Sequence, residues 1–301
     1  MTPRQFSAIA AALSDDPRQA MSQSRSMGLA GLVFDAFSAN LSLPDLSGTG
    51  RREFTHILQS SAQSLVAIRA DIGPRGFAPG ADLDRLLAGL DRVMQVARDL
   101  KAGAVSIDLG PLPEPTEPVK AKSTITPEQA GLILIPSSSE TSANAKTPAA
   151  TPAVRPPDPA FASHVDGALQ ALCGIAERFQ VRLGLHSSLS GFASLDRAMK
   201  SVRCPWFGVE LDPVAMLPDR WSVDETFSRW GDSIVHVLAR DATLGDAGRT
   251  RAMAVGAGDV AWEELLAALD SAGYRGWITL DPRDLPDPAG AMRSGLARLK
   301  S

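Results

Sequence analysis

Charged side chains follow the apolar runs of this chain at the points where predicted strands end. His186, Asp212 and Asp281 each close such a run. Side chains alternate across a strand, so each end residue shares a face with the residues two and four positions earlier. Charged groups that gather at one end of a sheet are suited to bind a small ligand. Further candidates at or near strand ends are Asp35, Arg69, Asp71, Asp108, Glu210, His236 and Arg240.

Each of these charges also has a purely structural explanation. An Asp after a strand often caps a helix or forms a turn. Arg69 and Arg240 could grip a phosphate or carboxylate, or they could be counter-ions of the neighbouring acids. His236 lies deeper along its strand than a mouth residue, which favours a hydrogen-bonded position, whereas the strand-end position of His186 fits either explanation. The repetition of such residues at one end favours a site.

The elements that must position these residues alternate between strand and helix. A strand over 64–71, for example, is followed by a helix over 81–101 with apolar residues at three- and four-residue spacing. Region 6–13 fits either a first strand or the start of a helix. Eight such pairs in about 250 residues predict the α/β class and a closed (β/α)8 TIM barrel, with 1–301 as a single domain. The alternative, an open doubly wound sheet, calls for a Gly-rich phosphate turn that the sequence lacks.

Residues 111–159 differ in composition from the rest of the chain. They are rich in Pro, Ser, Thr, Ala and Lys, and such a composition cannot bury enough apolar surface to order itself. We therefore predict a disordered surface insertion after the fourth strand. Its segment 131–136, GLILIP, is apolar enough to dock on the body as an extra strand or hairpin.

Composition excludes several classes of protein. With 44% hydrophobic and 21% charged residues the chain has the balance of a globular protein, and a net charge of −4 argues against a nucleic-acid surface. No apolar run reaches the length of a membrane span, and region 6–13 is a poor signal peptide because one Arg precedes it and acidic residues follow. Cys173 and Cys204 show no paired-motif spacing. We expect them to pack separately in a reducing compartment, which predicts a cytoplasmic location.

Several segments together carry a resemblance to a known family. They include GLVFDA, LVAIRADIG, VSIDLGPLP, VRLGLHS, FGVELDP, IVHVLARDA and GAGDVAWEELLAALDSAGYRGWITLD. They resemble the sugar phosphate isomerase/epimerase family of xylose isomerase-like TIM barrels. The resemblance implies carbohydrate metabolism, a small-molecule sugar or polyol as partner, no nucleic-acid or membrane partner, and a possible oligomer.

The resemblance also implies a metal-assisted reaction. In active members of the family a divalent ion is held by Glu, Asp, His and Glu at the ends of strands five to eight, and a proton moves on the carbon beside a sugar carbonyl. Carried to this chain, the ligands of Mn, Mg or Zn are His186, Asp212 and Asp281, with His186 and Asp281 as proton carriers. Leu238 stands where the family has its His, and it cannot bind a metal. The remaining residues implied in substrate binding are Arg69, Asp71, Asp108, Glu210, His236 and Arg240.

Whether the protein is an enzyme is therefore left open by its sequence. One hypothesis is a metal-assisted isomerase or epimerase. The other is a non-catalytic barrel that retains ligand binding or serves as a scaffold through its insertion. The endonuclease branch of the same barrel type needs a cluster of two or three metals rich in His and Glu. A chain with four His and a net negative charge does not suit that activity.

Overall fold

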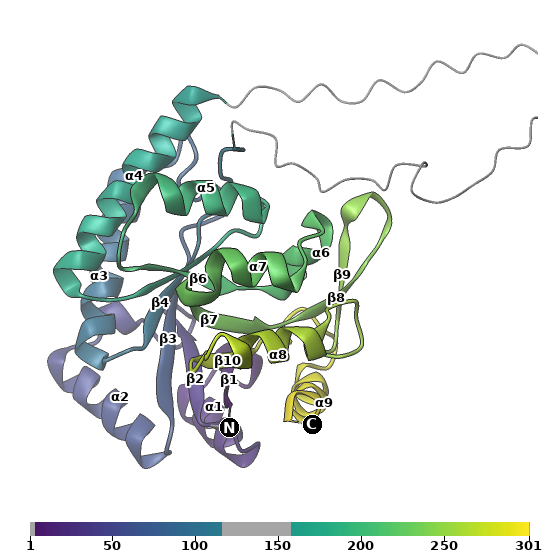
Figure 1. Ribbon diagram of the computed structural model, residues 1–301. Helices are drawn as coiled ribbons and strands as arrows, with labels where there is room; N and C mark the ends of the chain where they lie inside the picture. Colours follow the sequence, from purple (N-terminus) through teal and green to yellow (C-terminus); the bar gives the residue numbers. More distant parts are fainter. Residues whose placement is uncertain (1–3, 116–157, 301) are drawn as a thin grey trace, which may run out of the picture.

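The computed structural model describes residues 4–115 and 158–300. Within these ranges eight parallel strands close into a barrel, in the order β1-β10-β7-β6-β5-β4-β3-β2, so that the last strand pairs with the first (Figure 1). The predicted TIM barrel is thereby confirmed. The strands are β1 (Gln5–Ile9), β2 (Gly31–Asp35), β3 (Ser64–Ala70), β4 (Ala104–Asp108), β5 (Leu183–His186), β6 (Phe207–Leu211), β7 (Ile234–Ala239) and β10 (Trp277–Leu280).

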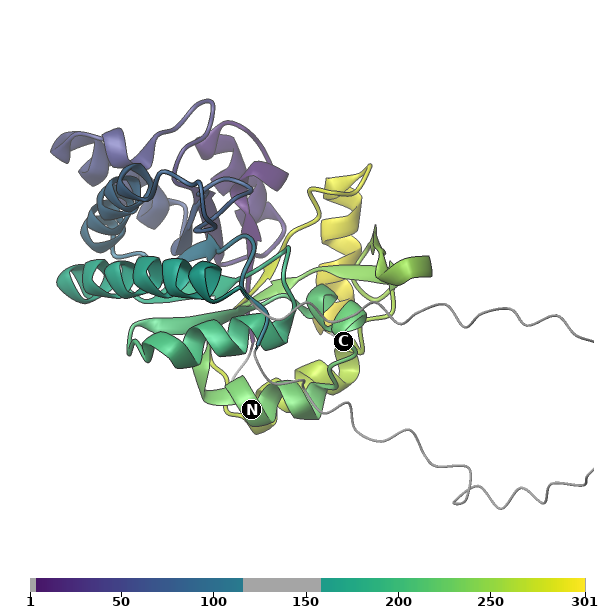
Figure 2. The same cartoon turned by 90° about the horizontal axis from the view of Figure 1, so that it is seen from above.

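Helices follow the strands and cover the outside of the barrel, and α3 and α4 lie side by side along one flank (Figures 1 and 2). Several helices begin at a side chain that accepts a backbone N–H, as Asp82 does for α3 and Ser222 for α7. Such caps fix where each helix leaves its loop. The helices are α1 (Pro17–Ser26), α2 (Gly48–Ser60), α3 (Leu83–Leu100), α4 (Pro159–Phe179), α5 (Phe192–Val202), α6 (Met216–Asp219), α7 (Val223–Trp230), α8 (Trp262–Ser271) and α9 (Pro288–Lys300).

The structure decides between the two alternatives for region 6–13. Residues 6–9 belong to the first strand, β1, and a short 3-10 helix, Ala10–Ala12, follows. Between β7 and α8 the chain forms an antiparallel hairpin of β8 (Asp241–Leu244) and β9 (Thr250–Met253). The hairpin lies beside α9 (Figures 1 and 2).

Asp241 fastens this hairpin to the barrel. Its carboxylate is buried and accepts N–H groups from Ala242 at 2.8 Å, Gly256 at 2.7 Å, Gly258 at 3.3 Å and Val260 at 3.2 Å. One side chain therefore ties the first residue of β8 to the turn that leads into α8.

Most of the predicted insertion 111–159, including 131–136, lies outside the described residues. Among the residues that the structure does describe, no helix combines the length and the hydropathy needed to cross a bilayer.

The two cysteines correct the expectation of separate packing. Cys173 in α4 and Cys204 before β6 form a disulfide with a Cα–Cα distance of 5.8 Å. They are 31 residues apart in the sequence, and the packing of α4 against α5, which ends just before Cys204, brings them together. Because the two cysteines are paired, they do not indicate a reducing compartment.

Candidate site at the strand ends

A cavity of about 300 Å³ opens at the carboxyl ends of the barrel strands. This is the end at which TIM barrels carry their sites. Leu238 lines the cavity together with most of the charged residues that the sequence analysis singled out. The predicted residues in the lining are Arg69, Asp71, Asp108, His186, Glu210, Arg240 and Asp281.

Glu210 forms the floor of the cavity and joins several strands. Its Oε2 accepts a hydrogen bond from Ser106 Oγ at 2.6 Å, and its Oε1 lies 2.5 Å from His236 Nδ1. His236 Nε2 in turn lies 2.5 Å from Thr279 Oγ1, which shares a hydrogen bond of 2.6 Å with Ser7 Oγ. All five side chains are buried. This polar layer crosses the barrel from β4 to β1, and it places His236 below the cavity as a hydrogen-bonded residue.

His186 stands above this layer and faces the cavity. Its Nδ1 lies 2.7 Å from Glu210 Oε2, and its Nε2 lies 3.8 Å from Asp108 Oδ2. Burial by itself lowers the pKa of His186, but the negative charges of Glu210, Asp108 and Asp212 outweigh burial and hold that pKa above 6.5. The same contacts act on Glu210. Burial alone would raise the pKa of its carboxyl, but His186 and His236 lower this pKa far below 4.5. His186 is therefore suited to carry a proton near neutral pH.

Arginines engage the two carboxylates that the resemblance implied as metal ligands. Asp212 Oδ2 accepts from Arg240 Nη1 at 2.6 Å, while its Oδ1 caps the turn at Val214. Asp281 Oδ1 accepts from Arg283 Nε at 2.6 Å and its Oδ2 from Arg283 Nη2 at 2.5 Å. Burial would raise the pKa of the Asp281 carboxyl, but the bonds and charge of Arg283, with Arg240, lower it further than burial raises it.

Two more pairs complete the rim. Arg69 donates to Asp35 Oδ1 through Nε at 2.6 Å. Asp108 Oδ2 accepts from Ser188 Oγ at 2.5 Å, and its Oδ1 accepts from the backbone of Gly110. Each candidate charge at the rim has a partner of its own, which fixes its position before any ligand arrives.

The side chains present do not fit the divalent ion that the resemblance implies. A metal would have to displace Arg240 from Asp212 and Arg283 from Asp281, and Leu238 offers it no donor atom. Among residues 4–115 and 158–300, no group of three His, Cys, Asp or Glu side chains is arranged to hold a metal ion. Positive charge at the mouth comes instead from guanidinium groups.

Some of the lining residues were not among the predicted site residues. Ser106 lies two positions before Asp108 and shares its face, a signal that alternation along the strand could have given. Ser188, Arg283 and Asp284 lie in loops beyond the strand ends, where periodicity says nothing about side-chain direction. Asp212 and His236, both predicted, do not line the cavity and act through Arg240 and Glu210.

Solved structures share the fold across nearly the whole chain. A xylose isomerase domain protein from Planctomyces limnophilus is 15% identical with a TM-score of 0.71, covering 99% of this chain and 96% of its own. The 3-keto-D-glucoside 4-epimerase of E. coli is 14% identical with a TM-score of 0.66, covering 99% of both chains. The IOLI protein, solved with a zinc atom, is 13% identical with a TM-score of 0.68, covering 99% of this chain and 98% of its own.

No curated protein matches the chain by sequence. The family model of the xylose isomerase-like TIM barrel matches residues 22–301. Since this match extends over most of the sequence, the chain belongs to the xylose isomerase-like TIM barrel family.

Proposed function

We propose that this protein binds a small, uncharged sugar or polyol in the strand-end cavity, without a metal ion. The observation that carries the proposal is the pairing of Asp212 with Arg240 and of Asp281 with Arg283. A carboxylate held by an arginine keeps lone pairs free to accept from hydroxyl groups, and the guanidinium can donate to the same ligand. The cavity of about 300 Å³ is at the lower end of the range for small-molecule sites.

Binding assays with a panel of pentoses, hexoses and cyclic polyols test this proposal. We expect saturable binding by calorimetry that EDTA does not reduce and Mn²⁺ does not increase. Arg283→Met should weaken binding by about tenfold or more, since it removes a charge-assisted donor worth about 1.4 kcal/mol or more. Arg275→Met is the matched control, because Arg275 precedes β10 at the other end of the barrel and should leave binding unchanged.

A metal-dependent site would give the opposite pattern. Stoichiometric Mn²⁺ or Zn²⁺ in the purified protein, lost in Asp212→Ala and in His186→Ala, would refute the metal-free proposal. It would support the metal-assisted isomerase or epimerase instead.

A second candidate function, proton transfer beside a sugar carbonyl, is favoured by His186 alone. Its imidazole faces the cavity and its pKa is raised, so it can donate a proton to a bound ligand at neutral pH. The second proton carrier expected from the resemblance, Asp281, is occupied by Arg283. Deuterium uptake from D₂O into a bound ketose, lost in His186→Gln, would support turnover, whereas binding without exchange supports the non-catalytic barrel.

A further inference from the structure

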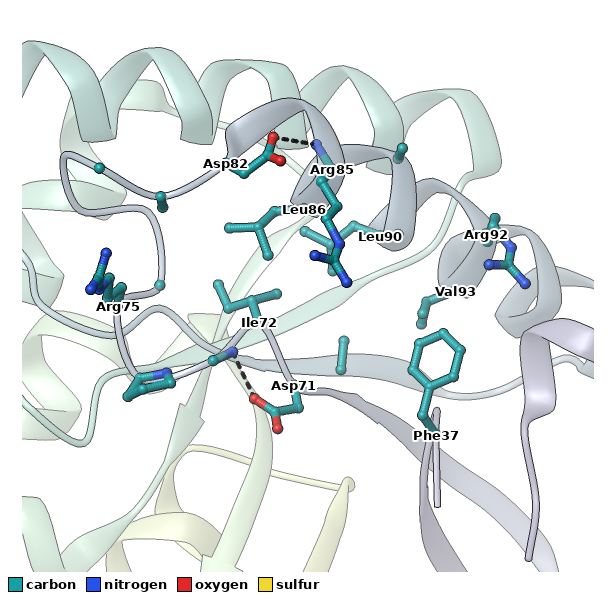
Figure 3. A pocket seen from close by; sticks show the side chains of 18 residues that line it. Phe37, Asp71, Ile72, Arg75, Asp82, Arg85, Leu86, Leu90, Arg92 and Val93 are labelled. Carbon is teal, nitrogen blue, oxygen red and sulfur yellow. Dashed lines mark hydrogen bonds between the residues drawn. The ribbon is translucent and has the colours of Figure 1, made fainter. Parts of the chain in front are cut away.

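A groove larger than the strand-end cavity lies against the first half of α3. Its volume is about 780 Å³. The loop of residues 71–82, the adjoining face of α3 and Phe37 from the loop after β2 bound it (Figure 3). Only Ala70 and Asp71 line both spaces, so the groove is a feature separate from the strand-end cavity.

The groove is open because α2 and the turn before it contact only the later part of α3. Arg51 at the start of α2 pairs with Asp99 near the end of α3. Asp45, just before α2, pairs with Arg92 in the second half of α3. Within the part of the chain that the structure describes, the first turns of α3 are therefore left uncovered on this flank.

The floor of the groove is apolar. Ile72, Leu90 and Val93 lie along it and are buried, and Leu86 is half-buried beside them. Phe37 forms one wall and is 50% exposed, which is unusual for a large apolar side chain on a folded protein. An apolar occupant would remove this surface from water.

One position of α3 in this groove carries no side chain. Gly89 lines the groove, and a Cβ built on it would meet no atom within 4 Å. Glycine inside a helix is destabilising relative to alanine, so local helix stability does not explain the residue. The missing side chain leaves room for another backbone to approach α3 closely. Gly89 therefore favours a segment of polypeptide as the occupant.

The charges that line the groove balance one another. Asp71 and Asp82 bring two negative charges, and Arg75 and Arg85 bring two positive charges. The remaining charged residue of the lining, Arg92, is neutralised by an ion pair. The lining thus has no excess charge to select an ionic ligand, and a neutral, apolar occupant suits it.

The chain itself contains a neutral, apolar segment of this kind. Residues 131–136 read GLILIP, and four of them in succession, Leu132 to Ile135, are aliphatic. They lie outside the described residues, between position 115, which follows β4, and position 158, which precedes α4.

Both of these positions are close to the groove. The helix α4 packs along α3 (Figure 1). The end of β4 touches the loop of the groove, since a Cβ on Gly76 would lie 1.9 Å from the carbonyl oxygen of Leu109. Residues 116–130 can span about 50 Å when extended, whereas crossing α3 requires about one helix diameter, roughly 10 Å. The segment can therefore reach the groove.

The groove also has the length of this segment. Its lining on α3 runs from Asp82 to Val93, which is about 17 Å along the helix axis. The extended residues 131–136 cover about 17 to 20 Å.

We propose that residues 131–136 of this chain occupy the groove. Their aliphatic side chains lie on the floor formed by Ile72, Leu90 and Val93, and their backbone passes close to Gly89. Docking removes the apolar surfaces of both the segment and the groove from water. This inference does not depend on which ligand the strand-end cavity binds.

Hydrogen exchange on the full-length protein tests the proposal. We expect the amides of residues 132–135 to exchange at least about tenfold more slowly than in a synthetic peptide of residues 128–140. Gly89→Trp fills the groove with a side chain and should remove this protection while the barrel stays folded by circular dichroism. Gly167→Trp is the matched control, because Gly167 in α4 also has open space at its Cβ but does not line the groove.

A variant of the segment itself gives a second test. Leu132→Ser combined with Leu134→Ser should empty the groove, and the neutral dye Nile red should then bind at least tenfold more tightly than to the natural protein. Adding Gly89→Trp should abolish this binding. Val119→Ser combined with Ile125→Ser is the control, since it removes apolar side chains elsewhere in the same region and should not increase dye binding.

Several results would overturn the proposal. Unprotected amides at residues 132–135 of the natural protein would show that the segment stays in water. Protection that survives Gly89→Trp would place the segment elsewhere on the molecule. Equal binding of Nile red to the natural protein and to the doubly substituted segment would mean that the groove is empty in both. Protection that increases with protein concentration would assign the groove to the segment of a second copy.

Discussion

Glu210 contacts side chains from three strands at the centre of the barrel, with hydrogen bonds to Ser106 and His236 and a close approach of His186. Ser106, His186 and His236 all contact its two oxygens, and 2% of its surface is exposed. Removing a partner of a buried carboxylate is strongly destabilising. Glu210 therefore links β4, β5 and β7 through side chains that each depend on its charge.

Glu210→Gln should lower the free energy of unfolding by about 2 to 3 kcal/mol, because a neutral amide weakens charge-assisted bonds and must present an N–H to one of these partners. Urea denaturation at pH 7 measures the loss. Glu53→Gln is the control, since Glu53 pairs with Arg18 in an exposed contact and should cost little. Equal losses in the two variants would contradict a central role for Glu210.

The raised pKa of His186 predicts how stability depends on pH. A histidine whose pKa is higher in the folded state contributes stability that is complete below its unfolded value of 6.5 and is lost as pH rises through the folded value. Glu210, whose pKa is lowered, contributes stability above 4.5 that is lost as pH falls. We expect the free energy of unfolding to fall above pH 6.5, and His186→Gln to lack that fall. A flat profile for the natural protein from pH 6.5 to 8.5 would show that the imidazole is not held in its charged form.

Sequence patterns could anticipate which residues gather at the mouth and could not anticipate what each one contacts. Strand alternation correctly predicted that His236 lies deep and His186 at the end. The Arg283 to Asp281 bond decides whether a metal can bind, yet it depends on the course of a loop after β10. The two-residue spacing of Asp281 and Arg283 does not specify that the arginine side chain folds back onto the aspartate.

At the scale of elements, the hairpin of β8 and β9 depends on one buried acid. Asp241 accepts N–H groups from Ala242, Gly256, Gly258 and Val260. Its neighbour Arg240 reaches the cavity rim, where it bridges Asp212 and Asp284. Two consecutive residues therefore have separate roles: Asp241 anchors the hairpin, and Arg240 contributes its guanidinium group to the cavity rim.

Asp241→Ala should destabilise the protein by about 3 kcal/mol, because several buried N–H groups lose their acceptor. Hydrogen exchange gives a local measure: the amides of Gly256 and Gly258 should exchange much faster than in the natural protein. Asp246→Ala, on the exposed tip of the hairpin, should change neither quantity. Unchanged exchange at the two glycines would mean that other contacts hold the turn.

The strands of this hairpin could not be predicted from sequence patterns, unlike the strands and helices of the barrel. The strand β3 and the helix α3 follow clear apolar periods, and the predicted ranges 64–71 and 81–101 lie within two residues of their observed bounds. The strands β8 and β9 have only four residues each and mix buried, half-buried and exposed positions, so their pattern is too short to identify them. Its structure comes from cross-strand pairing and from Asp241, which are contacts between residues distant in sequence.

At the scale of the whole molecule, the Cys173 to Cys204 disulfide closes a loop through α4, β5 and α5. Reduction should lower the free energy of unfolding by about 3 to 4 kcal/mol for a loop of this length. Denaturation with and without dithiothreitol measures the difference, and Cys173→Ser provides the comparison. Mass spectrometry after alkylation under denaturing conditions would contradict the pairing if both thiols of the untreated protein were modified.

Of the residues outside the described ranges, 116–157 fall between β4 and β5 in the sequence, where half of the barrel strands have been supplied. Residues 4–115 supply β1 to β4, and residues 158–300 supply β5, β6, β7 and β10. The two parts meet at two seams, β4 with β5 and β1 with β10, and α3 packs on α4 across the first. The hydrogen bond from Ser106 to Glu210 and the approach of His186 to Asp108 both cross between the parts.

The protein is in this sense two complementary fragments that share one site. Expressed separately as 1–115 and 158–301, the pieces should each lack ordered near-ultraviolet circular dichroism and should regain it when mixed in equal amounts. The residues that line the cavity come from both fragments, so ligand binding would report directly on whether the two fragments have associated. Fusing each fragment to one of two interacting proteins would then turn the strand-end cavity into a sensor of their association.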